Sequence, residues 1–244
     1  MQWAILSGIE GNIAAYEAVL KDIRRQGNID ELYILGDVIG PRFTSEQLIK
    51  RIQQQTDLPA QICTGWWEEQ LFNLYGWGAD TNATQLKQHY GVAGVERLWN
   101  AVSRETAQWL RSLNFGFFEF DCLLIHGSTV GCDDELTPET EPITLLDRIL
   151  RSEANSLFCG RSGLTFQYQV MAGQLSSTVQ TLDTPTLIAA EHPLSPRQVI
   201  GVGNVGRQSG HASYTLYNPY NNKVDFRTVT YRPTAQGFAK RHSS

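Results

Sequence analysis

Polar residues that could bind a metal ion or a phosphate follow several short apolar runs of the chain. Glu10 comes shortly after the run AIL, Asp37 follows YILG, His126 follows LLI and Arg161 follows LFCG. Such runs, alternating with helical patterns, predict a buried and largely parallel sheet. Open sheets bind ligands beyond the carboxyl ends of their strands, so these residues are candidates for a common site. The carboxylates suit Mg²⁺ or Mn²⁺, whereas the guanidinium suits a phosphate or carboxylate.

Six motifs in fixed order carry a resemblance to a known family. They are AILSGIEGN (4–12), YILGDVIG (33–40), QICTGWWEEQ (61–70), LLIHGS (123–128), LFCGRSG (157–163) and VIGVGNVG (199–206). Their order, spacing and flanks resemble the calcineurin-like metallophosphoesterase family, in its small bacterial phosphodiesterase-like branch. The resemblance extends from Trp3 to about Tyr231. It implies an α/β fold, a four-layer αββα sandwich of two mixed β-sheets flanked by helices.

The same resemblance implies a two-metal site, but this chain departs from it at most ligand positions. The family carries Asp-x-His, Gly-Asp, Gly-Asn-His, a lone His before Gly, and Gly-His-x-His. Only two residues match the expected ligands, Asp37 and His126. The corresponding positions here hold Gly8 and Glu10, Asp37, Trp66 and Trp67, His126, and Arg161 and Gly163. The resemblance therefore predicts the fold more clearly than it predicts an activity.

The remaining acidic residues have several possible roles. Gly8 removes one carboxylate and suits a tight turn between strand and helix. Glu10 could ligate Mg²⁺ or Mn²⁺ through oxygen, or it could pair with a nearby arginine. Asp37 could be a remnant ligand, a cap for backbone N–H groups, or an ion-pair partner of Arg161. We favour the last role and predict that Arg161 contacts Asp37 or Glu10.

The paired tryptophans either fill the former metal cavity or form a platform on which a ligand stacks. An indole offers only an N–H donor and cannot ligate a metal. We expect at least one of Trp66 and Trp67 to be core, and Glu68 to stand at the rim as a carboxylate. Arg161 could instead bind a phosphate or carboxylate in bidentate fashion, helped by Arg42 in the loop after Asp37.

Three hypotheses for function follow. The first is a non-catalytic pseudo-phosphoesterase that binds an unidentified small molecule or protein partner and needs no cofactor; its ligand-binding candidates are Glu10, Arg42, Trp66, Trp67 and Arg161. The second is a residual metal-dependent phosphoesterase with one Mn²⁺ or Mg²⁺ held by Glu10, Asp37 and His126. The third is an assembly role for a tryptophan-rich surface that includes Tyr75, Trp77, Tyr90 and Trp99.

Composition narrows the classes of partner. The 244 residues carry a net charge of −5 with acids and bases interspersed, so the basic stripe of a nucleic-acid binder is missing. No apolar run approaches the roughly 20 residues of a membrane span. Four cysteines without paired spacing indicate reduced thiols in a cytoplasmic protein. We expect one domain over 1–244, with a helical insertion at about 68–113.

Local patterns predict the individual elements. A helix should begin after the first strand and end at Gly27, and Thr44 with Gln47 resembles a capping box at the start of the next helix. Ser103 should cap a helix that reaches Leu113. The chain then turns from α/β to mostly β. Strands are expected at 3–6, 32–35, 61–63, 117–120, 122–125, 157–159, 166–170, 179–182, 186–190, 199–202, 213–217 and 224–229, and a helix at 145–150.

Overall fold

The computed structural model describes residues 1–233, apart from residues 43, 81 and 180–187, and shows two β-sheets packed face to face. The first sheet has the order β12-β11-β1-β2-β3 and the second has the order β4-β5-β6-β10-β7. The strands of the first are β1 (Trp3–Leu6), β2 (Glu31–Leu35), β3 (Ala60–Cys63), β11 (His211–Asn218) and β12 (Lys223–Thr230). Those of the second are β4 (Gly116–Glu119), β5 (Cys122–Ile125), β6 (Ser156–Cys159), β7 (Thr165–Val170) and β10 (Arg197–Val202).

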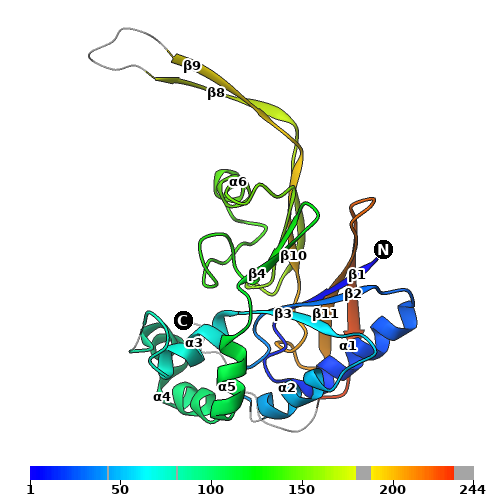
Figure 1. Ribbon diagram of the computed structural model, residues 1–244, viewed down its shortest axis with the longest axis vertical. Coiled ribbons are helices and arrows are strands. Elements are labelled where there is room, and N and C mark those ends of the chain that lie inside the picture. Colours follow the sequence, from blue (N-terminus) through cyan, green and yellow to red (C-terminus); the bar gives the residue numbers. More distant parts are fainter. Residues whose placement is uncertain (43, 81, 180–187, 234–244) are drawn as a thin grey trace.

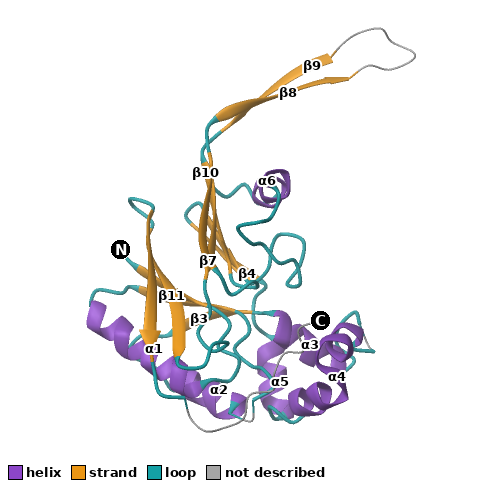
Figure 2. Cartoon of the chain, turned by 180° about the vertical axis from the view of Figure 1, so that it is seen from behind, coloured by secondary structure: helices purple, strands orange, loops and turns teal. Residues whose placement is uncertain are grey.

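Helices cover the outer faces of both sheets, as Figures 1 and 2 show. Near the first sheet lie α1 (Ile13–Gln26), α2 (Ser45–Gln53), α3 (Trp66–Leu74), α4 (Thr84–Trp99) and α5 (Arg104–Arg111). Beside the second lies α6 (Pro142–Leu150). The segment expected to be mostly helical thus holds α3, α4 and α5. The predicted αββα sandwich of two mixed sheets is confirmed.

Alternation along β1 explains why the sheets stack as they do. Ala4 and Leu6 belong to the core between the first sheet and its helices, whereas Trp3 and Ile5 belong to the core between the sheets. Successive residues of a strand point to opposite faces, so a strand that is apolar on both sides is buried on both sides. A third core joins the second sheet to α6 through Leu145.

Parallel pairing in the first sheet brings two loops together. β1 pairs in parallel with β2, so the loops that follow both strands leave the same edge. The N–H of Glu10 donates to the carbonyl of Asp37 over 2.8 Å. Both residues have a positive φ, 51° at Glu10 and 53° at Asp37. Non-glycine residues rarely adopt this conformation, and it gathers at functional sites.

Side-chain caps begin α1 and α5, the second of them predicted from the sequence, whereas the cap predicted at Thr44 is absent. The Asn12 side chain accepts a hydrogen bond from Ala15 N at the start of α1, and Ser103 accepts one from Thr106 N at the start of α5. Thr44 stands at the N-cap of α2, but its side chain makes no cap hydrogen bond. Its hydroxyl instead donates to the carbonyl of Gly11 over 2.5 Å. The predicted capping box at Thr44 is therefore wrong, because the side chain is directed at the loop after β1 and its oxygen accepts no N–H from the first turn of α2.

A two-stranded hairpin projects from the second sheet, well clear of the rest of the chain (Figures 1 and 2). It consists of β8 (Gly173–Val179) and β9 (Ile188–Leu194). The strands predicted at 179–182 and 186–190 overlap it only in part, and residues 180–187 lie outside the described residues. Pairing places Val170 opposite Arg197 in the body and Gly173 opposite Leu194 in the hairpin. The hairpin therefore keeps the register of the body, although residues 171–172 and 195–196 between the two pairs of strands are not part of either sheet.

All four cysteines are buried free thiols, as the sequence predicts. Burial raises the pKa of the Cys122 thiol to about 11 and that of Cys159 to about 12. Among the described residues, no helix is both long enough and apolar enough to span a bilayer.

Candidate functional site

Asp37 is the centre of a buried charge cluster where the loops of the first sheet meet the second sheet. Its side chain is fully buried. Oδ1 accepts a hydrogen bond from the Trp67 N–H over 2.8 Å, and Oδ2 accepts one from Arg207 Nη2 over 2.9 Å. Burial alone would raise the pKa of the Asp37 carboxyl, but His126 and Arg207 beside it hold that pKa well below its usual range. Asp37 is therefore an ionised, buried carboxylate.

Arg207 supplies the compensating positive charge. Its Nε donates to Glu10 Oε1 over 2.8 Å, and its Nη1 donates to the carbonyl of Arg161 over 2.8 Å. With Asp37, the guanidinium therefore joins three acceptors from three separate loops. Its side chain is only 12% exposed. A planar fork of donors suits such a junction better than an ammonium would.

Two glycines, at positions where the family that the motifs resemble carries ligands, make room for this guanidinium. A Cβ at Gly8 would lie 3.2 Å from Arg207 Nε, and one at Gly163 would lie 2.7 Å from Arg207 Nη1. Both glycines have a positive φ, 60° and 71°. The family carries an acid at the first position and a histidine at the second. Arg207 thus occupies space that any side chain at either position would need.

The predicted contact of Arg161 with Asp37 or Glu10 is wrong. The Arg161 guanidinium carbon lies over the Trp66 ring, 4.6 Å from its centroid, which is cation–π geometry. Arg161 still contributes to the low pKa of Asp37 through its charge. Arg42 reaches the site's edge, where its Nη2 donates to the carbonyl of Gly206 over 2.9 Å.

Trp66 and Trp67 are both core residues, 2% and 1% exposed. Their rings meet edge to face at 4.9 Å, and Tyr90 of α4 lies 4.7 Å from the Trp67 ring. The Trp66 indole N–H donates to Gln85 over 3.2 Å. Neither ring is open to a ligand, so α4 closes the side on which a stacking platform would have stood.

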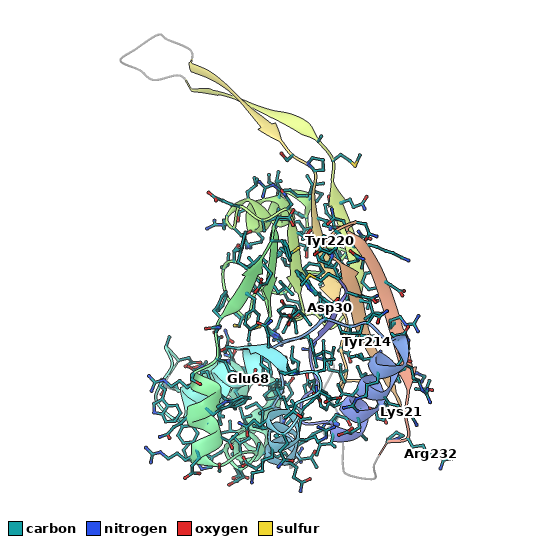
Figure 3. The ribbon with its side chains drawn as sticks, turned by 45° about the vertical axis from the view of Figure 1, so that its right-hand side comes forward. Lys21, Asp30, Glu68, Tyr214, Tyr220 and Arg232 are labelled. Atoms are coloured by element: carbon teal, nitrogen blue, oxygen red, sulfur yellow. The ribbon has the colours of Figure 1, made fainter. Side chains whose placement is uncertain are left out.

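Glu68 is a buried structural carboxylate, and the expectation of a rim position is wrong. Its Oε2 accepts from the N–H groups of Asp37 and Gly65 over 2.8 and 2.9 Å, and its Oε1 accepts from Ile39 over 3.0 Å. Figure 3 shows it where β3 meets α3. Burial, followed by the nearby charge of Asp37, raises the pKa of Glu68 to about 7. Glu68 fixes the loop that presents Asp37.

His126 keeps the orientation of a metal-bound histidine. Its Nδ1 lies 2.8 Å from the carbonyl of Leu35, and its Nε2 lies 3.3 Å from Asp37 Oδ2. The carbonyl contact places a proton on Nδ1, and Nε2 faces the ionised Asp37 carboxylate. The ring is fully buried, and Nε2 lacks the alignment of a hydrogen bond.

The remaining donors do not fit a metal ion. Among the described residues, no group of three His, Cys, Asp or Glu side chains is arranged to hold one. Glu10 and Asp37 direct an oxygen each at Arg207. A fixed guanidinium between two oxygen donors repels a cation at the point where the cation would bind.

Sequence reasoning missed Arg207 and the role of Glu68. Arg207 directly follows the glycine-rich segment ending at Gly206, whose backbone approaches the first loop closely: Gly206 N donates to the Gly8 carbonyl over 2.8 Å. The sequence does offer one indication of such a cation. Two carboxylates placed in one buried site require a positive charge from another loop.

The tryptophan-rich surface is partly core. Tyr75 and Trp77 stack at 4.5 Å, and Tyr75 lies 4.6 Å from Trp99. Tyr75, Trp77 and Tyr90 pack against the main core, whereas Trp99 is 45% exposed. The four residues therefore do not form one continuous exposed patch.

Comparison with known proteins identifies the fold. No protein-family model and no curated protein matches the sequence. Two solved structures resemble the chain at 20% identity each: a metallophosphoesterase from Sphaerobacter thermophilus (TM-score 0.65, covering 95% of this chain and 90% of that one) and a hypothetical protein from Pyrococcus horikoshii OT3 (TM-score 0.67, 94% and 88%). Together with the two mixed sheets and the strand-end site, this similarity shows that the chain has the calcineurin-like metallophosphoesterase fold.

Proposed function

We propose that this chain is a non-catalytic pseudo-phosphoesterase, in which an internal guanidinium takes the place of the metal ions. The observation that carries the proposal is the position of the Arg207 guanidinium. It binds Glu10 and Asp37 over 2.8 and 2.9 Å and fills the space beside Gly8 and Gly163. Phosphoester hydrolysis on this fold requires a clamp of metal ions on the attacking and leaving oxygens. A guanidinium offers positive charge but no open coordination position for water.

The proposal assigns the fold a binding role and favours a protein partner over a small molecule. Trp66 and Trp67 fill the interior and are covered by α4, so no aromatic platform is open to a base or sugar. The positive charge of Arg207 is compensated by Glu10 and Asp37. The cluster therefore attracts a charged small ligand only weakly.

One observation favours the alternative, a residual phosphoesterase with one Mn²⁺ or Mg²⁺. His126 Nε2 points at Asp37 with Nδ1 held by the Leu35 carbonyl, as in metal-bound histidines. For this alternative, Arg207 must first leave both carboxylates.

Metal stoichiometry and hydrolysis together test the proposal. The wild-type protein is dialysed against Mn²⁺ and then buffer, bound metal is measured by elemental analysis, and hydrolysis of an aryl phosphodiester is assayed with Mn²⁺ present. We expect a stoichiometry near zero and no turnover. Asp37→Ala should then change stability and leave the background hydrolysis unchanged. A stoichiometry near one, with turnover that Asp37→Ala abolishes, would establish the alternative.

A further inference from the structure

We propose that the projecting β8–β9 hairpin is a dimerisation arm that packs on the aromatic end of a second copy of this chain. The inference concerns the opposite end of the molecule from the charge cluster and does not depend on whether that cluster binds metal. It rests on the register of the arm, on its lack of support from its own body, and on the exposed apolar residues at its base.

The arm keeps the antiparallel register of β7 and β10 across an interruption of two residues in each strand. β7 and β10 pair from Thr165 opposite Val202 to Val170 opposite Arg197, and β8 and β9 continue from Gly173 opposite Leu194. Seven residues in each strand extend this ribbon by about 24 Å at ~3.4 Å per residue. In Figures 1 and 2, no other part of the described chain lies beside it.

The register divides the arm into two unlike faces. Residues opposite one another share a face, and the face changes at each step along a strand. One face holds mostly apolar positions: Leu175, Val179, Ile188, Ala190 and Leu194, with Ser177 and His192. The other holds mostly polar ones: Gln174, Ser176, Thr178 and Glu191, with Ala189 and Pro193. An amphipathic ribbon of this kind requires a partner for its apolar face.

The arm also lacks the charges that protect solitary strands. Among its fourteen described residues, Glu191 alone is charged when histidine is neutral. Natural edge strands that face water carry lysines, inward charges or bulges against unwanted pairing. A two-stranded ribbon is at best marginally stable alone in water. The composition of the arm is thus that of an interface element.

Exposed apolar side chains gather at the end of the body from which the arm leaves. Phe120 is 60% exposed, Tyr220 is 73% exposed, and their rings lie 6.3 Å apart. Met171, at the root of the arm, is 76% exposed. Figure 3 shows Tyr220 toward the end of the body that carries the arm. We call Phe120, Met171 and Tyr220 the basal cluster.

A hollow at the root of the arm completes this surface. Its volume is about 260 Å³, and its lining includes Met171, Pro196 and Arg197 from the arm's root and Asn222 from the β11–β12 turn. Small-molecule sites usually measure ~300–1,000 Å³, so the hollow suits protein side chains better than a whole ligand.

A second copy satisfies both surfaces at once. In a two-fold dimer the same patch serves on both sides, so each arm can cover the other body's basal cluster while its own cluster is covered in return. The seven residues named on the arm's apolar face, the basal cluster and the lining of the hollow together approach the roughly 20–30 residues a side of a stable interface. A different protein as occupant would leave the wild-type chain monomeric.

Light scattering after size-exclusion chromatography tests the dimer. We expect the wild-type protein at roughly 50 µM to have twice the chain mass of 27.4 kDa, since interfaces of this size bind with micromolar affinity or better. The arm is then removed by replacing residues 171–196 with Asn-Gly, a type I′ turn that joins Val170 to Arg197. This variant should be a monomer with unchanged far-UV circular dichroism per residue of the body.

A second variant guards against misfolding of the shortened chain. Phe120→Asn with Tyr220→Ser removes two exposed rings, and asparagine tolerates the φ of 56° at position 120. We expect the dimer to dissociate at least tenfold more readily. Val92→Ser, at a 70% exposed position on α4, is the matched control and should leave the dimer unchanged. A wild-type monomer, or a dimer that survives both arm removal and the double substitution, would overturn the proposal.

Discussion

Replacing Arg207 by methionine tests the central claim of the site, that a guanidinium neutralises two carboxylates in place of metal. Methionine keeps the length and apolar character of the stem while removing the charge and all donors. Asp37, fully buried, and Glu10, 13% exposed, then lose their cation. Breaking a buried pair by removing one partner costs about 3–5 kcal/mol because a charge stays behind unpaired. The 12% exposure of Arg207 admits some water, so we expect about 3 kcal/mol.

Equilibrium unfolding in urea measures this loss, with the six tryptophans as fluorescence probes. Arg24→Met is the matched control, because Arg24 pairs with Asp57 at the surface, with side chains 45% and 55% exposed. Solvent screens such an exposed pair, so the control should differ little from wild type. If Arg207→Met lowers the free energy of unfolding by less than about 1 kcal/mol, the guanidinium is not needed to neutralise the two carboxylates, and the reasoning fails.

Three further changes probe the same cluster from other directions. Gly8→Asp should destabilise the protein by about 2 kcal/mol or more in urea unfolding, since its Cβ meets Arg207 at 3.2 Å and its φ is 60°; a neutral result would show that Arg207 moves freely. Trp67→Ala should cost about 3–5 kcal/mol in the same assay because it opens a buried cavity, and a cost under 1 kcal/mol would mean that the ring is not core. Asp37→Asn should be less stable than wild type at neutral pH. The Asp37 pKa is lower in the folded than in the unfolded chain, so its contribution is fully present above the unfolded pKa of about 4 and is lost as the pH falls from there toward the folded value; between pH 5 and pH 2.5 the stability gap between variant and wild type should narrow, and a constant gap would refute the shift.

The layered fold could be predicted because its signals are local. The run from Trp3 to Leu6 is apolar at every position, which is sufficient to indicate a strand buried on both faces. Ser103, the cap predicted from the sequence, stands three residues before the N–H group that it caps, and Asn12 caps α1 at the same spacing. Such features depend on neighbours in sequence, so no knowledge of the tertiary arrangement is needed to find them.

The position of the charge cluster could be predicted from the sequence, but its ion pairs could not. Asp37 and Glu10 were placed by motif position, whereas their cation depends on contacts between residues far apart in the chain. Arg207 reaches Glu10 across 197 residues because Gly206 packs against the Gly8 carbonyl, a pairing that periodicity does not encode. Arg161 was the more obvious cation by motif, and it stacks on Trp66 instead.

Glu68 illustrates the opposite difficulty, a charged residue that is buried for structural reasons. Acidic residues are mostly exposed, so a rim position was the natural expectation. The loop after β2 leaves the N–H groups of Asp37 and Ile39 without partners in either sheet, and Glu68 accepts from both. Buried N–H groups need hydrogen-bond acceptors. Which N–H groups are buried and unpaired depends on the conformation of the loop, so the need for an acceptor at Glu68 is visible only in the folded structure.

The cluster also explains why the departures from the resembled family belong together. A side chain at Gly163 alone would collide with Arg207 and one at Gly8 would crowd it, and removal of Arg207 alone would leave Glu10 and Asp37 without the guanidinium that joins them. Restoration of one ligand at a time is therefore unfavourable in either order. Trp66 and Trp67 add a third barrier, because they fill the interior at the positions where the resembled family carries its amide and imidazole ligands. The guanidinium form and the metal form are thus two separate solutions to one problem, the neutralisation of a carboxylate that the fold holds in the interior.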